Sequence, residues 1–161
     1  MMNSINWGDL FDAGLFIGAL LEGDPRHAEA FPFVEAARKG ELRVCTTTGI
    51  LSEVYGALTW HLALPPHSPA EAAQVITRLL EFPSMIQILP DGLDAALKTM
   101  EIASVHNLTA RRIHDARHAA AALAAGVTTV HTYDVDDWKL FASDGLTVAG
   151  PPSGLRRLSG A

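Results

Sequence analysis

The sequence contains little that would support a disulfide, a cysteine-based metal site or a membrane span. Its 161 residues include one cysteine, Cys45, which excludes an intramolecular disulfide and a cysteine-rich zinc site. The longest apolar run, residues 15–21, is far shorter than the roughly 20 residues of a membrane-spanning helix. The N-terminus carries no basic, signal-like segment. We therefore expect a soluble, cytoplasmic protein with no membrane contact.

Positive charge is also scarce. Lys and Arg number 12 against 18 Asp and Glu, so the formal net charge is -6. A protein of this charge lacks the general basic field that drives nucleic-acid binding, and any nucleic acid must be held by local cations. The hydrophobic content of 48% and the length suit one compact core. We expect a single domain over residues 1–150 and a flexible tail over residues 151–161.

Short β-like runs alternate with segments of helical periodicity along the whole chain, which indicates α/β architecture. Strands are expected before Asp12 and over residues 42–46, 85–89, 127–133 and 146–149. Helices are expected over about residues 13–22, 27–39, 48–62, 69–81, 93–105 and 111–125. Strands separated by helices imply a central, mostly parallel sheet of four or five strands with right-handed crossovers.

Four carboxylates lie beside apolar runs, where a solubilising charge would not be expected. Asp12 and Asp134 each end a strand-like run, whereas Glu53 and Asp115 lie at the start of helical patterns. In parallel sheets, ligands gather outside the carboxyl ends of the strands. The four acids are therefore predicted to share one acidic pocket, although they are far apart in sequence.

An all-oxygen site without cysteine suits Mg²⁺ or Mn²⁺. Asp12, Asp115 and Asp134 are predicted to hold the metal directly, with Glu53 as a ligand or a water-mediated base. Without metal, the close carboxylates repel one another, and some should retain protons at a raised pKa. The alternative for Asp115 is a surface ion pair or a favourable acid at a helix N-terminus.

The helix around Glu53 has a face without bulky side chains, because Gly49, Gly56 and Ala57 lie one turn away. Backbone or ligand could approach the carboxylate there; the alternative is a solvated glutamate opposite the buried stripe. Three cations flank Asp115 and are candidates for binding backbone phosphates of a nucleic acid, or else are solvated residues on an exposed helix: Arg111, Arg112 and Arg117.

Two other enzyme classes compete with this interpretation. His114 and His118 lie one helical turn apart, like the zinc-binding face of HExxH hydrolases, but Asp115 is one methylene shorter than the glutamate base. Asp134 and Asp136 are spaced like the acids of the nucleophile loop of haloacid-dehalogenase phosphatases. That loop should open the sheet near the N-terminus, whereas here only about 25 residues of the chain follow Asp136.

Four ordered segments resemble the motif set of PIN domains, and most closely the short VapC-like toxins of type II toxin–antitoxin pairs. They read FDAGLFI at residues 11–17, ILSEVY at 50–55, IHDARHAA at 113–120 and VHTYDVDDW at 130–138. The similarity covers about residues 9–150. It implies a PIN-like fold and a metal-dependent endoribonuclease that a VapB-like antitoxin inhibits, with a homodimer as the expected assembly.

The resemblance also assigns roles to individual residues. It places Asp12, Glu53, Asp115 and Asp134 at the four acids of the family, Thr132 at a frequent polar position and Asp137 at a possible outer-shell acid beside Trp138. One departure is Ala13, where the family usually has serine or threonine. This departure favours the main alternative, a PIN-like module of weak or no activity that serves protein association or RNA binding.

Overall fold

The computed structural model describes residues 5–158 and has a five-stranded sheet at its centre. In chain order the strands are β1 (Asp9–Phe11), β2 (Val44–Thr46), β3 (Gln87–Ile88), β4 (Thr129–His131) and β5 (Thr147–Gly150). Their spatial order is β3-β2-β1-β4-β5, and every neighbouring pair is parallel. The predicted α/β class and parallel sheet are confirmed.

The helices follow the apolar periodicity of the sequence. They are α1 (Ala13–Leu20), α2 (His27–Lys39), α3 (Thr48–Thr59), α4 (Pro69–Leu80), α5 (Leu93–Val105), α6 (Ile113–Ala124), α7 (Val135–Trp138) and α8 (Pro152–Leu158). Two 3₁₀ turns, η1 (Ala110–Arg112) and η2 (Lys139–Asp144), lead into α6 and follow α7. The expected helix starting at residue 111 thus begins as a 3₁₀ turn.

Helix ends agree with the signals in the sequence. Ser68 and Glu71 form a capping box, with Pro69 at the first position of α4. Thr47 caps α3, because its hydroxyl accepts a hydrogen bond from the backbone N–H of Ile50. Gly40 ends α2 in the left-handed conformation, which glycine adopts without steric cost.

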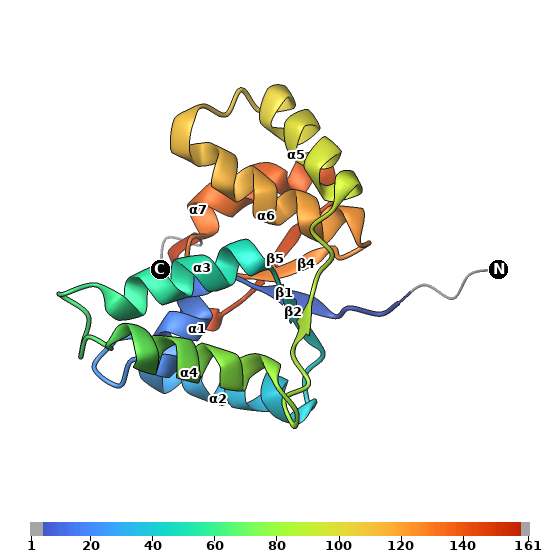
Figure 1. The fold of residues 1–161 in the computed structure, drawn as a ribbon. Coiled ribbons are helices and arrows are strands. Elements are labelled where there is room, and N and C mark those ends of the chain that lie inside the picture. Colours follow the sequence, from blue (N-terminus) through green and yellow to red (C-terminus); the bar gives the residue numbers. More distant parts are fainter. Residues whose placement is uncertain (1–4, 159–161) are drawn as a thin grey trace.

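Helices cover both faces of the sheet. Figure 1 shows α5 and α6 on one side and α1, α2 and α4 on the other, with α3 between the two groups. Helix α3 packs against α1, α4 and α6, so it joins the two helical layers. Because α3 starts directly after β2, this position brings its first turns to the carboxyl end of the sheet. The first turns of α3 thus lie beside the residues that follow the strands.

The core lies between the sheet and these helices. Its largest fully buried side chains include Phe11 of β1, Phe16 of α1, Ile50 of α3, Trp138 of α7 and Phe141 of η2. Burial of each such side chain stabilises the fold by about 1.5–3 kcal/mol. Phe11 and Trp138 flank the acidic residues described below, so the same packing that stabilises the fold also fixes the site.

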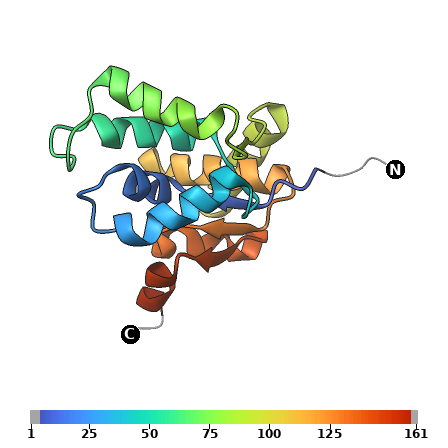
Figure 2. The same ribbon diagram turned by 90° about the horizontal axis from the view of Figure 1, so that it is seen from below.

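The expected tail contains helix α8, which lies at the edge of the molecule beside β5 (Figure 2). Its first turn is attached to α2, because the backbone N–H and hydroxyl of Ser153 donate to Glu29, at 3.2 and 2.5 Å. Tyr133 donates to the same carboxylate at 2.8 Å. Residues 159–161 lie outside the described part. Within residues 5–158, no helix has the length and apolar character to cross a membrane.

Candidate active site

The strand and helix termini bring the predicted acids to one end of the sheet. Asp12 follows β1 directly, and Asp134 lies just beyond the neighbouring strand β4, at the N-terminus of α7. Glu53 belongs to the second turn of α3, and Asp115 to the first turn of α6. The four residues thus come from four different elements whose ends lie toward the carboxyl side of the sheet.

Asp12 is the most deeply buried of these acids, with 5% of its surface exposed. Its Oδ2 accepts hydrogen bonds from Oγ1 of Thr132 at 2.7 Å and from Nε1 of Trp138 at 3.0 Å. Burial raises the pKa of Asp12, although hydrogen bonds from Thr132 and the Ala13 N–H oppose the rise; the charge of Asp134 adds to it. The carboxyl group is therefore held in a fixed orientation.

Thr132 connects two of the acids. Its side chain is fully buried, and its hydroxyl donates to Asp12 while accepting the backbone N–H of Asp134 at 3.0 Å. One hydroxyl group therefore sets the orientation of the Asp12 carboxyl and the start of the turn that carries Asp134. It also supplies a hydroxyl beside Asp12, whose following residue, Ala13, has none.

Asp115 is half-buried, and its pKa is raised from 3.8 to about 6. Burial is the largest cause, followed by the negative charges of Asp137 and Asp12; Glu53 adds a smaller contribution, and His118 opposes the rise. The charges of three other acids therefore act on Asp115. Asp137, predicted as an outer acid, is exposed and takes part in this field.

Glu53 does not stand on an empty helix face. Its Oε1 lies 2.6 Å from Nε2 of His118, which is 3% exposed. The space beside Gly49 is filled by the same imidazole, because a Cβ added at Gly49 would lie 2.9 Å from Cε1 of His118. Gly56 has no neighbour within 4 Å of such a Cβ, so the outer part of the face is open.

The donor set fits a hard divalent cation by its chemistry, since it consists of carboxylates whose mutual repulsion a cation would relieve. In residues 5–158, however, no three His, Cys, Asp or Glu side chains are already arranged to hold a metal ion. The zinc alternative is not supported, because both ring nitrogens of His118 contact other groups and His114 is exposed.

The three predicted phosphate-binding cations have different surroundings. Arg111 and Arg112 are exposed in η1, just before Asp115. Arg117 instead pairs with Asp91 of the loop after β3, with Nη2 and Oδ2 at 2.8 Å. This hydrogen bond holds the pKa of Asp91 below its usual range. Arg117 is thus held in an ion pair, whereas Arg111 and Arg112 are exposed side chains shortly before Asp115.

A cation that the sequence analysis did not select also lies near the site. The guanidinium of Arg26 lies 5.4 Å from the centre of the Tyr133 ring. The hydrogen bond to Asp24 is the main cause of the raised pKa of Arg26, and the charge of Asp134 adds to it. Asp24 binds it through two hydrogen bonds of 2.8 and 2.9 Å. Spacing within the sequence offers no signal for this contact.

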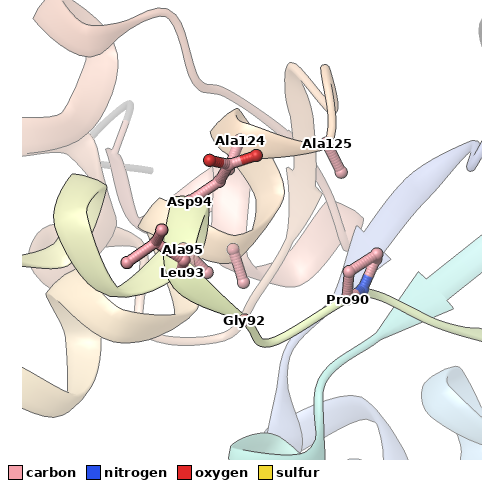
Figure 3. A pocket seen from close by; sticks show the side chains of 8 residues that line it. Pro90, Gly92, Leu93, Asp94, Ala95, Ala124 and Ala125 are labelled. Atoms are coloured by element: carbon pink, nitrogen blue, oxygen red, sulfur yellow. The ribbon is translucent and has the colours of Figure 1, made fainter.

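The acidic region is distinct from a shallow cavity of about 230 Å³ at the start of α5 (Figure 3). Pro90, Gly92, Leu93 and Asp94 line one side, and alanines of α5 and α6 line the rest. It contains none of the four predicted acids. The cavity therefore plays no part in the candidate site.

The raised pKa of Asp115 gives a stability prediction for the metal-free protein. Asp115 titrates near 3.8 when unfolded and near 6 when folded, so the folded state binds more protons between these values. The free energy of unfolding should therefore fall as the pH rises through this window. In Asp115→Asn this contribution is absent, and the variant should gain stability over wild type between about pH 4 and pH 7.

Urea unfolding in EDTA, at about pH 4 and at about pH 7, measures the free energy of unfolding and checks this expectation. Asp94→Asn, which changes an exposed acid of α5, is the control and should show no such gain. A stability difference between Asp115→Asn and wild type that is independent of pH would contradict the raised pKa.

Comparison with known proteins places this geometry in a family. The model of the PIN domain matches residues 10–142. No curated protein matches the sequence. Among solved structures, VapC20 of Mycobacterium tuberculosis, described as a sarcin–ricin loop cleaving toxin, superposes with a TM-score of 0.65 at 18% identity; the match covers 88% of this chain and 98% of that one.

Two further structures come from toxin–antitoxin complexes. A complex from Klebsiella pneumoniae gives a TM-score of 0.58 at 19% identity, over 89% of this chain and 97% of the other. VapBC-1 from nontypeable Haemophilus influenzae gives 0.59 at 15% identity, over 87% and 95%. These structures share the fold, and the family model covers most of the sequence. The chain therefore belongs to the PIN-domain family.

Proposed function

We propose that this chain is a metal-dependent endoribonuclease toxin of a VapBC-like toxin–antitoxin pair, with residues 1–150 as the nuclease domain. The proposal is supported chiefly by the charges of Asp12, Asp115 and Asp134, since that of Asp134 acts on Asp12 and that of Asp12 acts on Asp115. The similarity to VapC20, described as a cleaving toxin, supports the reaction class.

Asp12, Asp115 and Asp134 would bind Mg²⁺ or Mn²⁺, and Glu53 completes the catalytic acids. A bound divalent cation lowers the pKa of water and offsets the charge that develops on the attacked phosphodiester. Thr132 and Trp138 hold Asp12 in orientation, so the carboxylate needs no reordering when a substrate arrives. Asp137 adds negative charge at the rim, which favours cation binding.

RNA would bind through exposed cations near the acids. Arg111 and Arg112 precede Asp115 in η1 and are free to contact backbone phosphates on the approach to the pocket. The pocket itself is acidic and repels phosphate, so the phosphate at the cleavage point would be attracted through the bound cation. Metal removal should therefore weaken both binding and cleavage.

The proposed partners are a VapB-like antitoxin and a second copy of the chain. Two of the structural neighbours are described as a toxin–antitoxin complex and as VapBC-1. Helix α5 exposes Leu93, Leu97 and Met100, which lie on one face of the helix at 72%, 61% and 59% exposure. Such apolar surface is characteristic of protein contacts. A toxin of this kind would act in the cytoplasm.

The second candidate is a PIN-like module for protein association or RNA binding without cleavage. Two observations favour it: Ala13 takes the place of a hydroxyl residue, and the described residues hold no ready-made metal set. The complete set of acids opposes it. A module of this kind would bind RNA or an antitoxin without any dependence on Mg²⁺ or Mn²⁺.

Cleavage of RNA by the purified chain separates the two functions. We expect single-stranded RNA to be cut in Mg²⁺ or Mn²⁺, to stay intact in EDTA, and to be cut again when metal is restored. Sequencing of the product ends would give the cleavage site. Intact RNA under all metal conditions, with RNA or antitoxin still bound, would rule out the nuclease and favour the binding module.

A further inference from the structure

His118 is a buried imidazole inside the acidic region whose role the proposed function leaves open. It belongs to α6, one turn beyond Asp115, and only 3% of its surface is exposed. Nε2 lies 2.6 Å from Oε1 of Glu53, and Nδ1 lies 3.4 Å from Oγ1 of Thr47. One ring nitrogen thus faces Thr47, the residue that caps α3, and the other faces Glu53 within α3.

The hydrogen bonds have a consistent direction. The Thr47 hydroxyl oxygen accepts the backbone N–H of Ile50, so its own proton is available for Nδ1 of His118. An ionised carboxylate only accepts hydrogen bonds, so Nε2 carries the proton that faces Glu53. The partner of one nitrogen sets the tautomer presented by the other. The cap of α3 therefore orients the imidazole that contacts the acid of α3.

The packing around the ring is specific to this arrangement. A Cβ at residue 49 would lie 2.9 Å from Cε1 of His118, closer than such atoms approach, so only glycine admits the ring here. The Glu53 side chain is 46% exposed and would otherwise sample several rotamers. A contact from a fixed, buried donor restricts it to the conformation in which its charge acts on Asp115.

We propose that His118 is a positioning residue that holds the Glu53 carboxylate toward the other acids of the site. The proposal rests on the nuclease function proposed above. In this role His118 contacts Glu53 and touches neither substrate nor metal. Groups that orient a catalytic or ligating side chain in this way typically change activity by 10–100-fold when removed. We expect a loss of roughly this size in the rate constant kcat, with little change in KM.

A double-mutant cycle tests the coupling. His118→Leu keeps an apolar side chain in the buried position but removes both nitrogens, and it should lower kcat by roughly 10–100-fold. His118→Gln retains an N–H donor and should recover most of the activity. In a Glu53→Gln background, His118→Leu should cause no further loss. Losses that multiply in the double variant, or equal losses for leucine and glutamine, would overturn the proposal.

His106 offers a matched control, because its Nε2 lies 2.6 Å from Oδ2 of Asp144 and neither residue is among the proposed catalytic or metal-binding residues. His106→Leu removes the same kind of contact and should lower stability without lowering kcat. An equal loss of kcat in this variant would show that His118→Leu acts through stability alone, which would overturn the positioning role.

An NMR measurement that does not depend on RNA cleavage tests this proposal separately from the nuclease proposal. Nitrogen-15 NMR of the imidazole should show the Nε2-protonated tautomer of His118 in wild type, and Glu53→Gln should shift its signals. The Nδ1-protonated form would overturn the contact as described. If wild type gives the expected tautomer but cuts no RNA in Mg²⁺ or Mn²⁺, the nuclease proposal fails while the contact stands.

Discussion

Asp115→Asn is expected to lower metal-dependent RNA cleavage by at least about 100-fold while leaving the protein folded. The amide has nearly the same shape as the carboxylate but lacks its charge, so it binds a divalent cation poorly. A bound metal ion contributes several kcal/mol of charge stabilisation in the transition state, and about 1.4 kcal/mol corresponds to a factor of ten in rate. Single-turnover cleavage of a labelled RNA in excess Mg²⁺ measures the loss.

The fold of this variant should be at least as stable as that of wild type without metal. Burial is the main cause of the raised pKa of Asp115, and the negative charges of Asp137, Asp12 and Glu53 add to it. Removal of one charge from this group relieves repulsion. A rise in melting temperature with a fall in activity would therefore place Asp115 in the site, since a mere folding defect gives the opposite sign.

Asp136→Asn is the matched control. Asp136 belongs to α7, next to Asp137, but its side chain is 85% exposed and pairs with Lys139 at 3.1 Å. This substitution removes a neighbouring negative charge without altering the proposed metal ligands, so cleavage should stay close to the wild-type rate. Asp115→Asn with more than half of the wild-type activity would contradict a ligand role for Asp115.

The positions of Asp12 and Asp134 could be predicted from the sequence because the signal is local. Each follows a β-like run and precedes a helical turn, and adjacent parallel strands carry such residues to the same edge. The contacts that hold them were not predictable from spacing. Trp138 donates to Asp12 across 126 positions of the chain, and only the folded order of β1 and β4 brings them together.

The surroundings of Glu53 show where sequence patterns stop being sufficient. The small residues at positions 49, 56 and 57 predicted room for backbone or ligand beside Glu53, but a side chain of another helix fills the space at Gly49, and only the space at Gly56 is open. Helical periodicity concerns one helix at a time. It gives no sign that α6 contributes His118 to the space at Gly49. Arg117 is similar, because its partner Asp91 lies in the loop after β3.

Thr132→Val is expected to destabilise the protein by about 1–3 kcal/mol and to lower cleavage by roughly tenfold or more. Valine has nearly the shape of threonine, so packing in this fully buried position is preserved. Two hydrogen bonds are lost together: the one donated to Oδ2 of Asp12 and the one accepted from the N–H of Asp134. Buried groups without partners cost free energy, and the two acids lose their common anchor.

Thr132→Ser separates the hydroxyl from the methyl group. Serine keeps the hydrogen bonds to Asp12 and Asp134, so cleavage should stay near wild type even if loss of the methyl costs about 0.8 kcal/mol of stability. Thr147→Val makes the same substitution at an exposed position of β5 and is the control for any effect of valine on strand stability. If urea unfolding and cleavage assays gave equal defects for serine and valine, the hydroxyl would not be what orients the acids.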